Sequence, residues 1–296
     1  MMVRHLTLLK PLTLTAIALL TFSPGSLNTH PARAAERVQF ESARYQAGPL
    51  QLRLARERGE TVTRAPADVI DGYLTKPEGA GPFPAIVHLH GCSGLPAAFK
   101  AGTDKGLWSE RLAGWGYVVL AVDSFTTRGI AHACSGGLAP RIADATGALA
   151  WLSRQSFVDA KRIAVIGFSQ GAITALAAVG QHDYALFDHE ENRQFRAAIA
   201  FYPLCPADST MTVPTLILIG ELDDWTRAAA CKTMMADRTG AGSPVRLIVY
   251  PGAHHGFDVV SLQPGLEMFG HRVEYNADAA ERASEEVRQF LAQQLR

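Results

Sequence analysis

Short apolar runs alternate with segments of helical periodicity along most of the chain. The apolar runs predict strands at 69–74, 85–90, 117–122, 162–166, 197–202, 215–219 and 245–250. Apolar side chains at helical spacing predict helices at 107–113, 142–152, 226–236 and 278–295, with a further helix after Ser169. The polar segment 181–195 lacks a clear period and is interpreted as a surface excursion or a short helix. Apolar strands that alternate with helices predict an α/β fold, with a mostly parallel sheet covered on both faces.

The first 34 residues follow a different pattern. Basic side chains precede an apolar stretch at 12–22 that is too short to span a bilayer, and Ala32-Arg33-Ala34 offers a small-x-small cleavage site. This pattern predicts a cleaved signal peptide over 1–34 and a single exported domain over 35–296, in the periplasm or outside the cell. A retained membrane anchor is the alternative interpretation.

Composition narrows the classes of partner. The chain is 48% apolar and 19% charged, so it has ample material for one well-packed core. Its 28 Lys and Arg balance its 28 Asp and Glu, and no basic run interrupts that balance. Neither a nucleic acid nor an anionic membrane is therefore predicted as a partner.

Four cysteines follow the predicted cleavage site: Cys92, Cys134, Cys205 and Cys231. An oxidising compartment permits two disulfides among them, in three possible pairings. We favour Cys205 with Cys231, because each lies just beyond the end of a neighbouring predicted element, which leaves Cys92 with Cys134. A zinc site is the competing interpretation, but no two cysteines are close enough in sequence to form a ligand pair. Four free thiols are a third interpretation.

The strand at 162–166 runs directly into Gly167-Phe168-Ser169-Gln170-Gly171, and an Ala-rich helical pattern follows. A serine on a sharp strand-to-helix turn exposes its hydroxyl at the end of the sheet, and flanking glycines allow the turn. Ser169 is therefore the candidate nucleophile.

A serine hydroxyl needs a histidine base, and the histidine needs a carboxylate to orient it. In folds of this kind the carboxylate comes next in the chain and the histidine comes last. Asp223 and Asp224 follow one strand, and His254 and His255 follow the next. One aspartate is expected to serve the histidine while the other caps a helix.

The oxyanion of an acyl-transfer intermediate needs hydrogen-bond donors. The N–H of Gln170, at the start of a helix, is one candidate. The loop His90-Gly91-Cys92-Ser93-Gly94 follows another strand end, and its glycines let the backbone approach the site. We expect the N–H of Cys92 to be the second donor.

These segments resemble the dienelactone hydrolase family. The resemblance rests on VHLHGCSG at 87–94, DSFTTRG at 123–129, FYP at 201–203, GELDDWT at 220–226 and YPGAHHGFD at 250–258. It extends over nearly the whole chain from Val69 onward. It implies an α/β-hydrolase fold and a catalytic triad of Ser169, Asp223 and His255, with no cofactor.

The chain departs from the family pattern at the nucleophile. The enzymes that give the family its name use a cysteine, whereas this chain has Ser169, which favours general ester hydrolysis over dienelactone cleavage. The strand-to-helix turn at 167–171, here called the elbow, also resembles that of bacterial carboxylesterases and acyl thioesterases.

Several side chains near the predicted strand ends are candidates for other roles. His88 and His90 share a strand face, but the further ligands of a metallohydrolase are missing, so no metal is predicted. His90 is expected to support the oxyanion loop and His88 to lie in the core. Arg128 and His132 either contact the substrate or tie down their loop. Three aromatic side chains are candidates for the wall of a substrate pocket, with a place in the core as the alternative: Phe125, Phe168 and Trp225.

The sequence therefore predicts an exported serine hydrolase that cleaves a small-molecule carboxylic ester or lactone through an acyl-enzyme on Ser169. An inactive ligand-binding protein on the same fold, a thioesterase and a peptidase are the alternatives. A nucleotide-dependent oxidoreductase is disfavoured, because no Gly-x-Gly-x-x-Gly turn follows an early strand.

Overall fold

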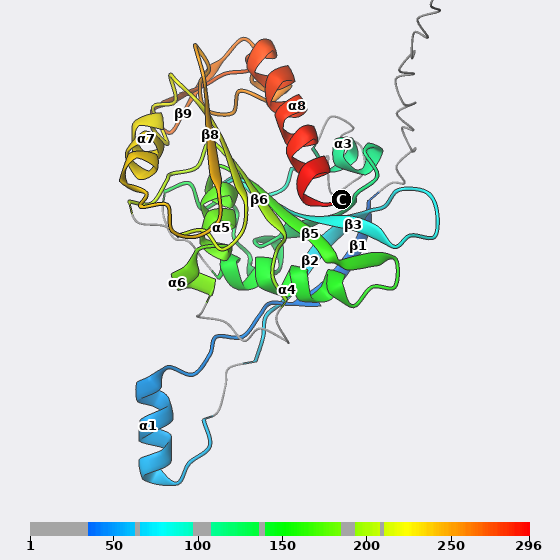
Figure 1. Cartoon of the computed structure of the whole chain (residues 1–296), viewed down its shortest axis with the longest axis vertical. Helices are drawn as coiled ribbons and strands as arrows, with labels where there is room; N and C mark the ends of the chain where they lie inside the picture. The colour runs from blue at the N-terminus through cyan, green and yellow to red at the C-terminus, as the bar shows by residue number, and fades with distance from the viewer. Residues whose placement is uncertain (1–34, 63–65, 97–107, 136–139, 185–192, 208–209) are drawn as a thin grey trace, which may run out of the picture.

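The computed structural model describes residues 35–62, 66–96, 108–135, 140–184, 193–207 and 210–296. Their centre is an eight-stranded sheet in the order β1-β2-β4-β3-β5-β6-β7-β8 (Figure 1). The strands are β1 (Glu36–Glu41), β2 (Val69–Thr75), β3 (Phe83–Leu89), β4 (Val118–Asp123), β5 (Val158–Phe168), β6 (Ala197–Phe201), β7 (Thr215–Gly220) and β8 (Val245–Tyr250). β2 is antiparallel to both of its neighbours, and the six strands from β4 to β8 in sheet order are parallel.

Helices cover both faces of this sheet. α3 (Trp108–Gly114) and α8 (Ala277–Gln294) lie on one face, and α4 (Arg141–Ser153) and α5 (Gln170–Ala178) lie on the other (Figure 1). α7 (Ala228–Asp237) packs beside β8. The α/β class predicted from the apolar pattern is therefore confirmed.

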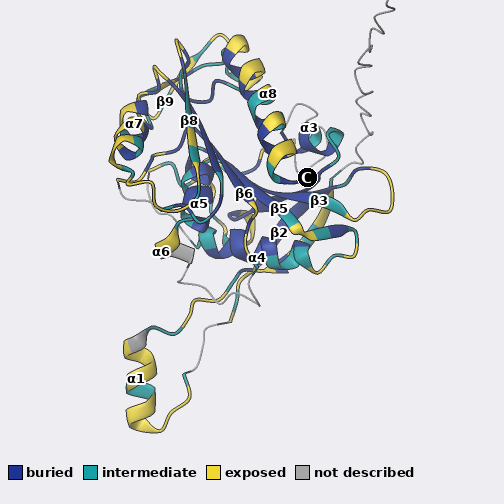
Figure 2. Ribbon diagram, viewed as in Figure 1, coloured by how far each residue is buried: buried dark blue, intermediate teal, exposed yellow. Residues whose placement is uncertain are grey.

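The central strands are buried at nearly every position. All six residues of β4, β7 and the last six of β5 are buried, which Figure 2 shows as a dark blue sheet between partly exposed helices. A strand covered on both faces must be apolar on both faces, which is why these runs do not alternate with polar residues. Their burial is the main stabilising contribution to the fold.

The seven predicted strands are present, and all but β8 differ from the prediction at one or both ends. β5 begins at Val158 rather than at 162, because Val158 pairs with Phe83 although the residues between are polar. The polar segment after α5 contains the short helix α6 (Gln181–Tyr184), which confirms the second interpretation of that segment. The predicted helix at 107–113 is observed as α3, although position 107 lies outside the described residues.

The sequence pattern missed several short or exposed elements. They are β1, α1 (Pro49–Arg58), β9 (Leu266–Met268), β10 (His271–Val273) and the 3-10 turns η1 (Thr126–Arg128) and η2 (Val260–Leu262). α1 projects away from the sheet and is largely exposed (Figures 1 and 2), so no apolar face marks it in the sequence. β9 and β10 pair with each other over three residues each, which is too short for a period to be visible.

Two disulfides join the four cysteines, Cys92 to Cys134 and Cys205 to Cys231, as the favoured pairing predicted. The predicted signal peptide lies outside the described residues. Within the described ranges, none of the helices has the length and hydrophobicity that crossing a membrane requires.

Candidate active site

Ser169 lies on a strained turn between β5 and α5. Its φ of 52° and ψ of −118° are unfavourable for a residue with a Cβ, and such backbone strain is concentrated at functional sites. Glycine is required on both sides of this turn, because neighbouring backbone leaves no room for a Cβ atom. A Cβ on Gly167 would lie 2.1 Å from the carbonyl oxygen of Gly171, and a Cβ on Gly171 would lie 2.2 Å from that of Leu89. The turn therefore holds the half-buried Ser169 hydroxyl above the carboxyl end of the sheet.

His255 and Asp223 lie beside Ser169. The Nε2 atom of His255 is 3.0 Å from the Oγ atom of Ser169, and its Nδ1 atom is 2.8 Å from the Oδ2 atom of Asp223. Both partners are buried, with 5% of His255 and 3% of Asp223 exposed. The three side chains thus form one hydrogen-bonded chain that opens toward solvent only at Ser169.

The loops after β7 and β8 bring these residues together by direct backbone contact. The N–H of Leu222 donates to the carbonyl of Ala253 at 2.9 Å. A Cβ on Gly220 would lie 2.2 Å from that same carbonyl oxygen, so the approach needs a glycine. Because neighbouring parallel strands end at the same edge, the two loops meet beside Ser169.

Asp223 holds the turn that precedes α7 and also faces the histidine. Its Oδ1 atom accepts hydrogen bonds from the N–H groups of Trp225 at 3.0 Å and Thr226 at 2.8 Å, while its Oδ2 atom faces His255. The side chain of Asp224 is half exposed and points instead toward His271, at 3.5 Å. The expectation of a helix-capping aspartate was wrong, because α7 begins at Ala228 with Arg227 at its N-cap and has no side-chain cap.

His254 points away from Ser169. Its Nε2 atom lies 4.0 Å from a carboxylate oxygen of Glu274. The backbone of His255 is fixed by bridging to Val273 of β10, whose neighbour Glu274 donates its N–H to the His255 carbonyl at 3.2 Å. Of the two adjacent histidines, the structure places His255 against the serine.

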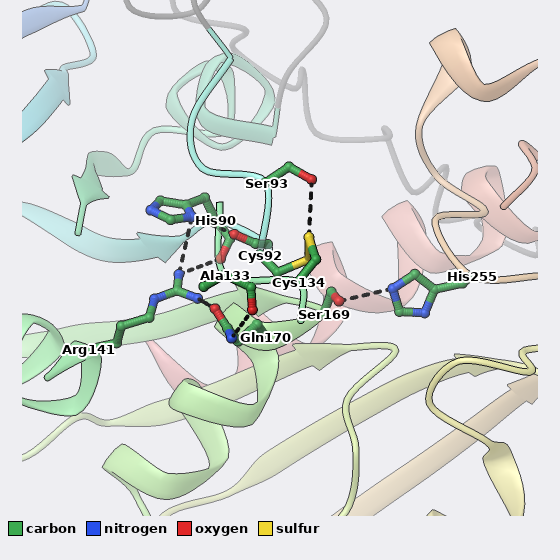
Figure 3. Close-up of a disulfide and its surroundings, with 10 residues drawn as sticks. His90, Cys92, Ser93, Ala133, Cys134, Arg141, Ser169, Gln170 and His255 are labelled. Atoms are coloured by element: carbon green, nitrogen blue, oxygen red, sulfur yellow. Dashed lines mark hydrogen bonds between the residues drawn. A yellow bond between two sulfur atoms is a disulfide. The ribbon is translucent and has the colours of Figure 1, made fainter. Parts of the chain in front are cut away.

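The loop after β3 lies across from the histidine. A Cβ on Gly91 would sit 3.7 Å from the Cβ of Ser169, so this loop is in contact with the elbow. The N–H of Cys92 donates to no group among the described residues. The Cys92–Cys134 disulfide and Gln170 lie beside Ser169 (Figure 3). Two backbone segments suited to hydrogen-bond donation thus flank the serine.

A cavity of about 290 Å³ opens at Ser169 and His255. Its remaining lining is mostly apolar and includes Leu95, Trp108, Phe168, Tyr202, Trp225, Val259, Leu262, Met268 and Val273. A second hollow of about 300 Å³ lies between the segment around α1 and the start of α4, away from the serine. The first cavity is the relevant one, because it contains the hydrogen-bonded side chains.

Comparison with known proteins identifies the family of this chain. The dienelactone hydrolase family matches residues 70–295. The chain belongs to the dienelactone hydrolase family. A candidate carboxymethylenebutenolidase of Yersinia pestis is 25% identical over 249 residues, which are 75% of this chain and 83% of that relative.

Solved structures share the fold of this family member. A dienelactone hydrolase-like promiscuous phosphotriesterase from metagenomic libraries superimposes with a TM-score of 0.60 at 19% identity, covering 89% of this chain and 100% of that one. The propionate-bound Thermogutta terrifontis esterase Est2 gives a TM-score of 0.57 at 22% identity, covering 76% of this chain and 89% of that one. The α/β-hydrolase fold expected from the sequence is confirmed, and family membership makes the chain a carboxylic ester hydrolase.

Two of the four predicted pocket residues line the cavity of this family member, and two do not. Phe168 and Trp225 line it. Phe125 is buried against His90, with ring centroids 4.6 Å apart, so it belongs to the core beneath the loop. Arg128 forms ion pairs with Asp68 and Asp144, both at 2.8 Å, and thus ties down its loop. Of the two interpretations left open for each residue, these contacts favour the core for Phe125 and loop support for Arg128.

The sequence did not single out a polar group inside the cavity. Asp258 accepts hydrogen bonds from the indole N–H of Trp108 at 2.7 Å and from the hydroxyl of Tyr202 at 2.8 Å. Burial raises the pKa of Asp258 above its ordinary value, and the two donors partly offset that rise. Its position three residues after His255, at the end of the last matching motif, was the available signal.

The two histidines of β3 and its following loop are buried. The Nδ1 atom of His88 lies 2.7 Å from the Ser109 hydroxyl, and burial lowers the pKa of His88 to about 4. The Nδ1 atom of His90 lies 2.6 Å from the carbonyl of Gly91. Burial, with the nearby charge of Arg141, lowers the pKa of His90 to about 3. Both are therefore neutral at physiological pH.

Proposed function

We propose that this protein is an exported serine hydrolase that cleaves a small-molecule carboxylic ester or lactone through an acyl-enzyme on Ser169. The observation that carries the proposal is the hydrogen-bonded chain from Ser169 to His255 at 3.0 Å and on to Asp223 at 2.8 Å. Together with the strained elbow, this arrangement activates a serine for nucleophilic attack.

In the proposed mechanism, His255 takes the proton of Ser169 as its Oγ atom attacks the substrate carbonyl. The N–H groups of Cys92 and Gln170 hold the oxyanion, and Asp223 stabilises the imidazolium. His255 then gives the proton to the leaving alkoxide, and the carbon–oxygen bond of the ester breaks. Water attacks the acyl-enzyme with His255 again as base, which releases the acid and restores the serine hydroxyl.

The lining of the cavity supports an uncharged, largely apolar acyl group. Among the described lining residues, Asp258 is the one carboxylate and there is no lysine or arginine to pair with an anionic substrate. The volume of about 290 Å³ is at the small end of ligand sites. We therefore expect small neutral esters and lactones to be better substrates than acidic ones.

Two features support export. The N-terminal 34 residues have the charge and hydropathy pattern of a signal peptide. All four cysteines that follow are paired in disulfides, which persist in oxidising compartments.

The test uses purified protein spanning 35–296, exposed to a fluorophosphonate and then to a panel of p-nitrophenyl esters and lactones. We expect one adduct, on Ser169, located by peptide mass spectrometry. Ser169→Ala should lower kcat by at least about 10³-fold without changing the melting temperature by more than a few degrees. Ser243→Ala, at the opposite edge of the sheet, is the matched control and should keep full activity. Near-normal turnover by Ser169→Ala would refute the proposal.

A further inference from the structure

A buried arginine connects the two segments that carry the proposed oxyanion donors. Arg141 lies in the first turn of α4 with 1% of its surface exposed. One terminal nitrogen donates to the Oε1 atom of Gln170 at 2.8 Å, and the other donates to the carbonyl of His90 at 2.5 Å. Figure 3 shows the guanidinium between these two groups. One planar side chain thus bonds to both Gln170 and the loop that leads to Cys92.

The connection closes into a ring through the disulfide. The side-chain amide of Gln170 donates to the carbonyl of Ala133 at 3.2 Å, and the N–H of Ala133 donates to the carbonyl of Cys92 at 2.8 Å. The next residue, Cys134, is covalently bonded to Cys92 (Figure 3). The loop after β3, the loop after η1, the start of α5 and the start of α4 are therefore tied together around the serine.

The chemistry of Arg141 fits a positioning role. Burial lowers its pKa to about 10, so the guanidinium keeps its charge at neutral pH despite the cost of desolvation. His90 beside it is neutral, and the guanidinium lies over the ring of Phe125, 5.2 Å from its centroid. A rigid fork of donors fixes two acceptors at a set separation, which a flexible ammonium cannot do.

We propose that Arg141 and the Cys92–Cys134 disulfide are positioning groups that hold the two oxyanion donors at the spacing needed by the transition state. This inference rests on the proposed serine-hydrolase function. Oxyanion donors act only when they lie about 2.7–3.1 Å from the developing charge, so a small shift of the Cys92 loop removes one of them. The disulfide is then required for turnover and not only for stability.

The chain contains a matched control for this idea. The Cys205–Cys231 disulfide closes a loop of 26 residues, comparable with the 42 residues between Cys92 and Cys134, and neither of its cysteines is in the oxyanion loop. Cys134→Ala opens the first disulfide and leaves the Cys92 N–H in place. Cys205→Ala opens the second. The two variants should lose comparable thermal stability but differ in catalysis.

The measurements are kcat and KM on p-nitrophenyl acetate, and Ki for a trifluoromethyl ketone, which forms a tetrahedral oxyanion adduct on an activated serine. For Cys134→Ala we expect kcat to fall about 10²-fold, with KM within about threefold and Ki raised in parallel with the loss of kcat. Cys205→Ala should keep kcat within about threefold. Equal losses in both variants, or an unchanged Ki in Cys134→Ala, would overturn the inference.

Arg141 is tested by replacement. Arg141→Lys keeps the charge but supplies no fork, so it should show the same kcat-specific loss as Cys134→Ala. Arg141→Lys with wild-type kcat and Ki would overturn the role assigned to Arg141.

Chemical reduction provides a test that needs no variant. Dithiothreitol supplies two electrons and two protons and closes into a cyclic disulfide, while the Cys92–Cys134 bond opens to two thiols. Cys134 is partly exposed and Cys231 is fully buried, so the first disulfide should open first. Activity should fall as alkylation reveals the Cys92 and Cys134 thiols, and should return on reoxidation. Full activity with these thiols labelled would overturn the inference.

The serine-hydrolase function and the positioning role of Arg141 and the disulfide can be refuted separately. A folded wild-type protein that forms no fluorophosphonate adduct and cleaves no ester would refute the serine-hydrolase function, and this inference with it. An active wild-type protein that is indifferent to loss of Cys134 would refute the positioning role alone.

Discussion

Replacing Asp223 by asparagine should abolish most of the activity, because the two carboxylate oxygens have different partners. Oδ1 accepts from two backbone N–H groups, those of Trp225 and Thr226, so the asparagine oxygen must occupy that position. The amide NH₂ then faces the Nδ1 atom of His255, where the carboxylate stood 2.8 Å away. A donor at that position stabilises the tautomer that carries its proton on Nε2. His255 would then point an N–H at Ser169 and be unable to accept its proton.

The size of the loss in kcat depends on which of two orientations the asparagine amide adopts. The flipped amide would restore the acceptor to His255 but would place NH₂ against both backbone N–H groups. That loses two hydrogen bonds to the amide oxygen and leaves two backbone donors unpaired, which costs about 3 kcal/mol. The wrong tautomer therefore dominates. Loss of the base and of the charge that stabilises the imidazolium lowers kcat by about 10⁴-fold, which corresponds to about 5 kcal/mol of transition-state stabilisation.

The assay is initial-rate hydrolysis of p-nitrophenyl acetate by the wild type, Asp223→Asn and Asp224→Asn, with a melting curve for each. Asp224 is the matched control, because it is adjacent in sequence but half exposed and directed at His271. We expect Asp224→Asn to stay within about twofold of the wild type. Activity of Asp223→Asn within tenfold of the wild type, or a larger loss in Asp224→Asn, would refute the tautomer argument.

Two further predictions concern acid stability and substrate size. His88 and His90 have folded-state pKa values of about 4 and about 3, below the unfolded value of 6.5, so their stabilising effect is complete above pH 6.5 and is lost as pH falls toward 4. His88→Gln should lower the slope of unfolding free energy against pH in this window by up to about 1.4 kcal/mol per pH unit, measured by urea titrations of the wild type and the variant. Equal slopes in the two proteins would contradict this. Trp225 lines the cavity with its ring centroid 5.1 Å from that of His255. Trp225→Ala should raise the ratio of kcat/KM for butyrate over acetate esters about tenfold, and an unchanged ratio would place the acyl chain elsewhere.

The central strands were predictable because a strand buried on both faces must be apolar throughout. β8 has the predicted bounds, and the other predicted strands differ mainly at their ends. The ends differ because backbone pairing decides them, as where polar residues extend β5 back to Val158. α1 and the β9–β10 pair were missed because few of their residues face the core.

The serine elbow was predictable because its steric demands leave a local mark. Only glycine fits at positions 167 and 171, where a Cβ would collide with backbone oxygens. The pocket was less predictable, since the lining side chains come from segments far apart in the sequence. Trp108 and Tyr202 meet at Asp258, and no pattern within any one segment reports such a contact.

The sequence by itself determined the class of fold, the candidate nucleophile and the order of its partners, because burial and tight turns act on neighbouring residues and so appear as local patterns. Tertiary structure alone decided that Asp223 serves both backbone and histidine, that Phe125 and Arg128 support the loop rather than line the cavity, and that Arg141 joins the two proposed oxyanion segments. Apart from the contacts of Asp223 with its own turn, those outcomes depend on distances between atoms that are 16 to 60 residues apart in the chain. Such distances are set only when the strands assemble side by side.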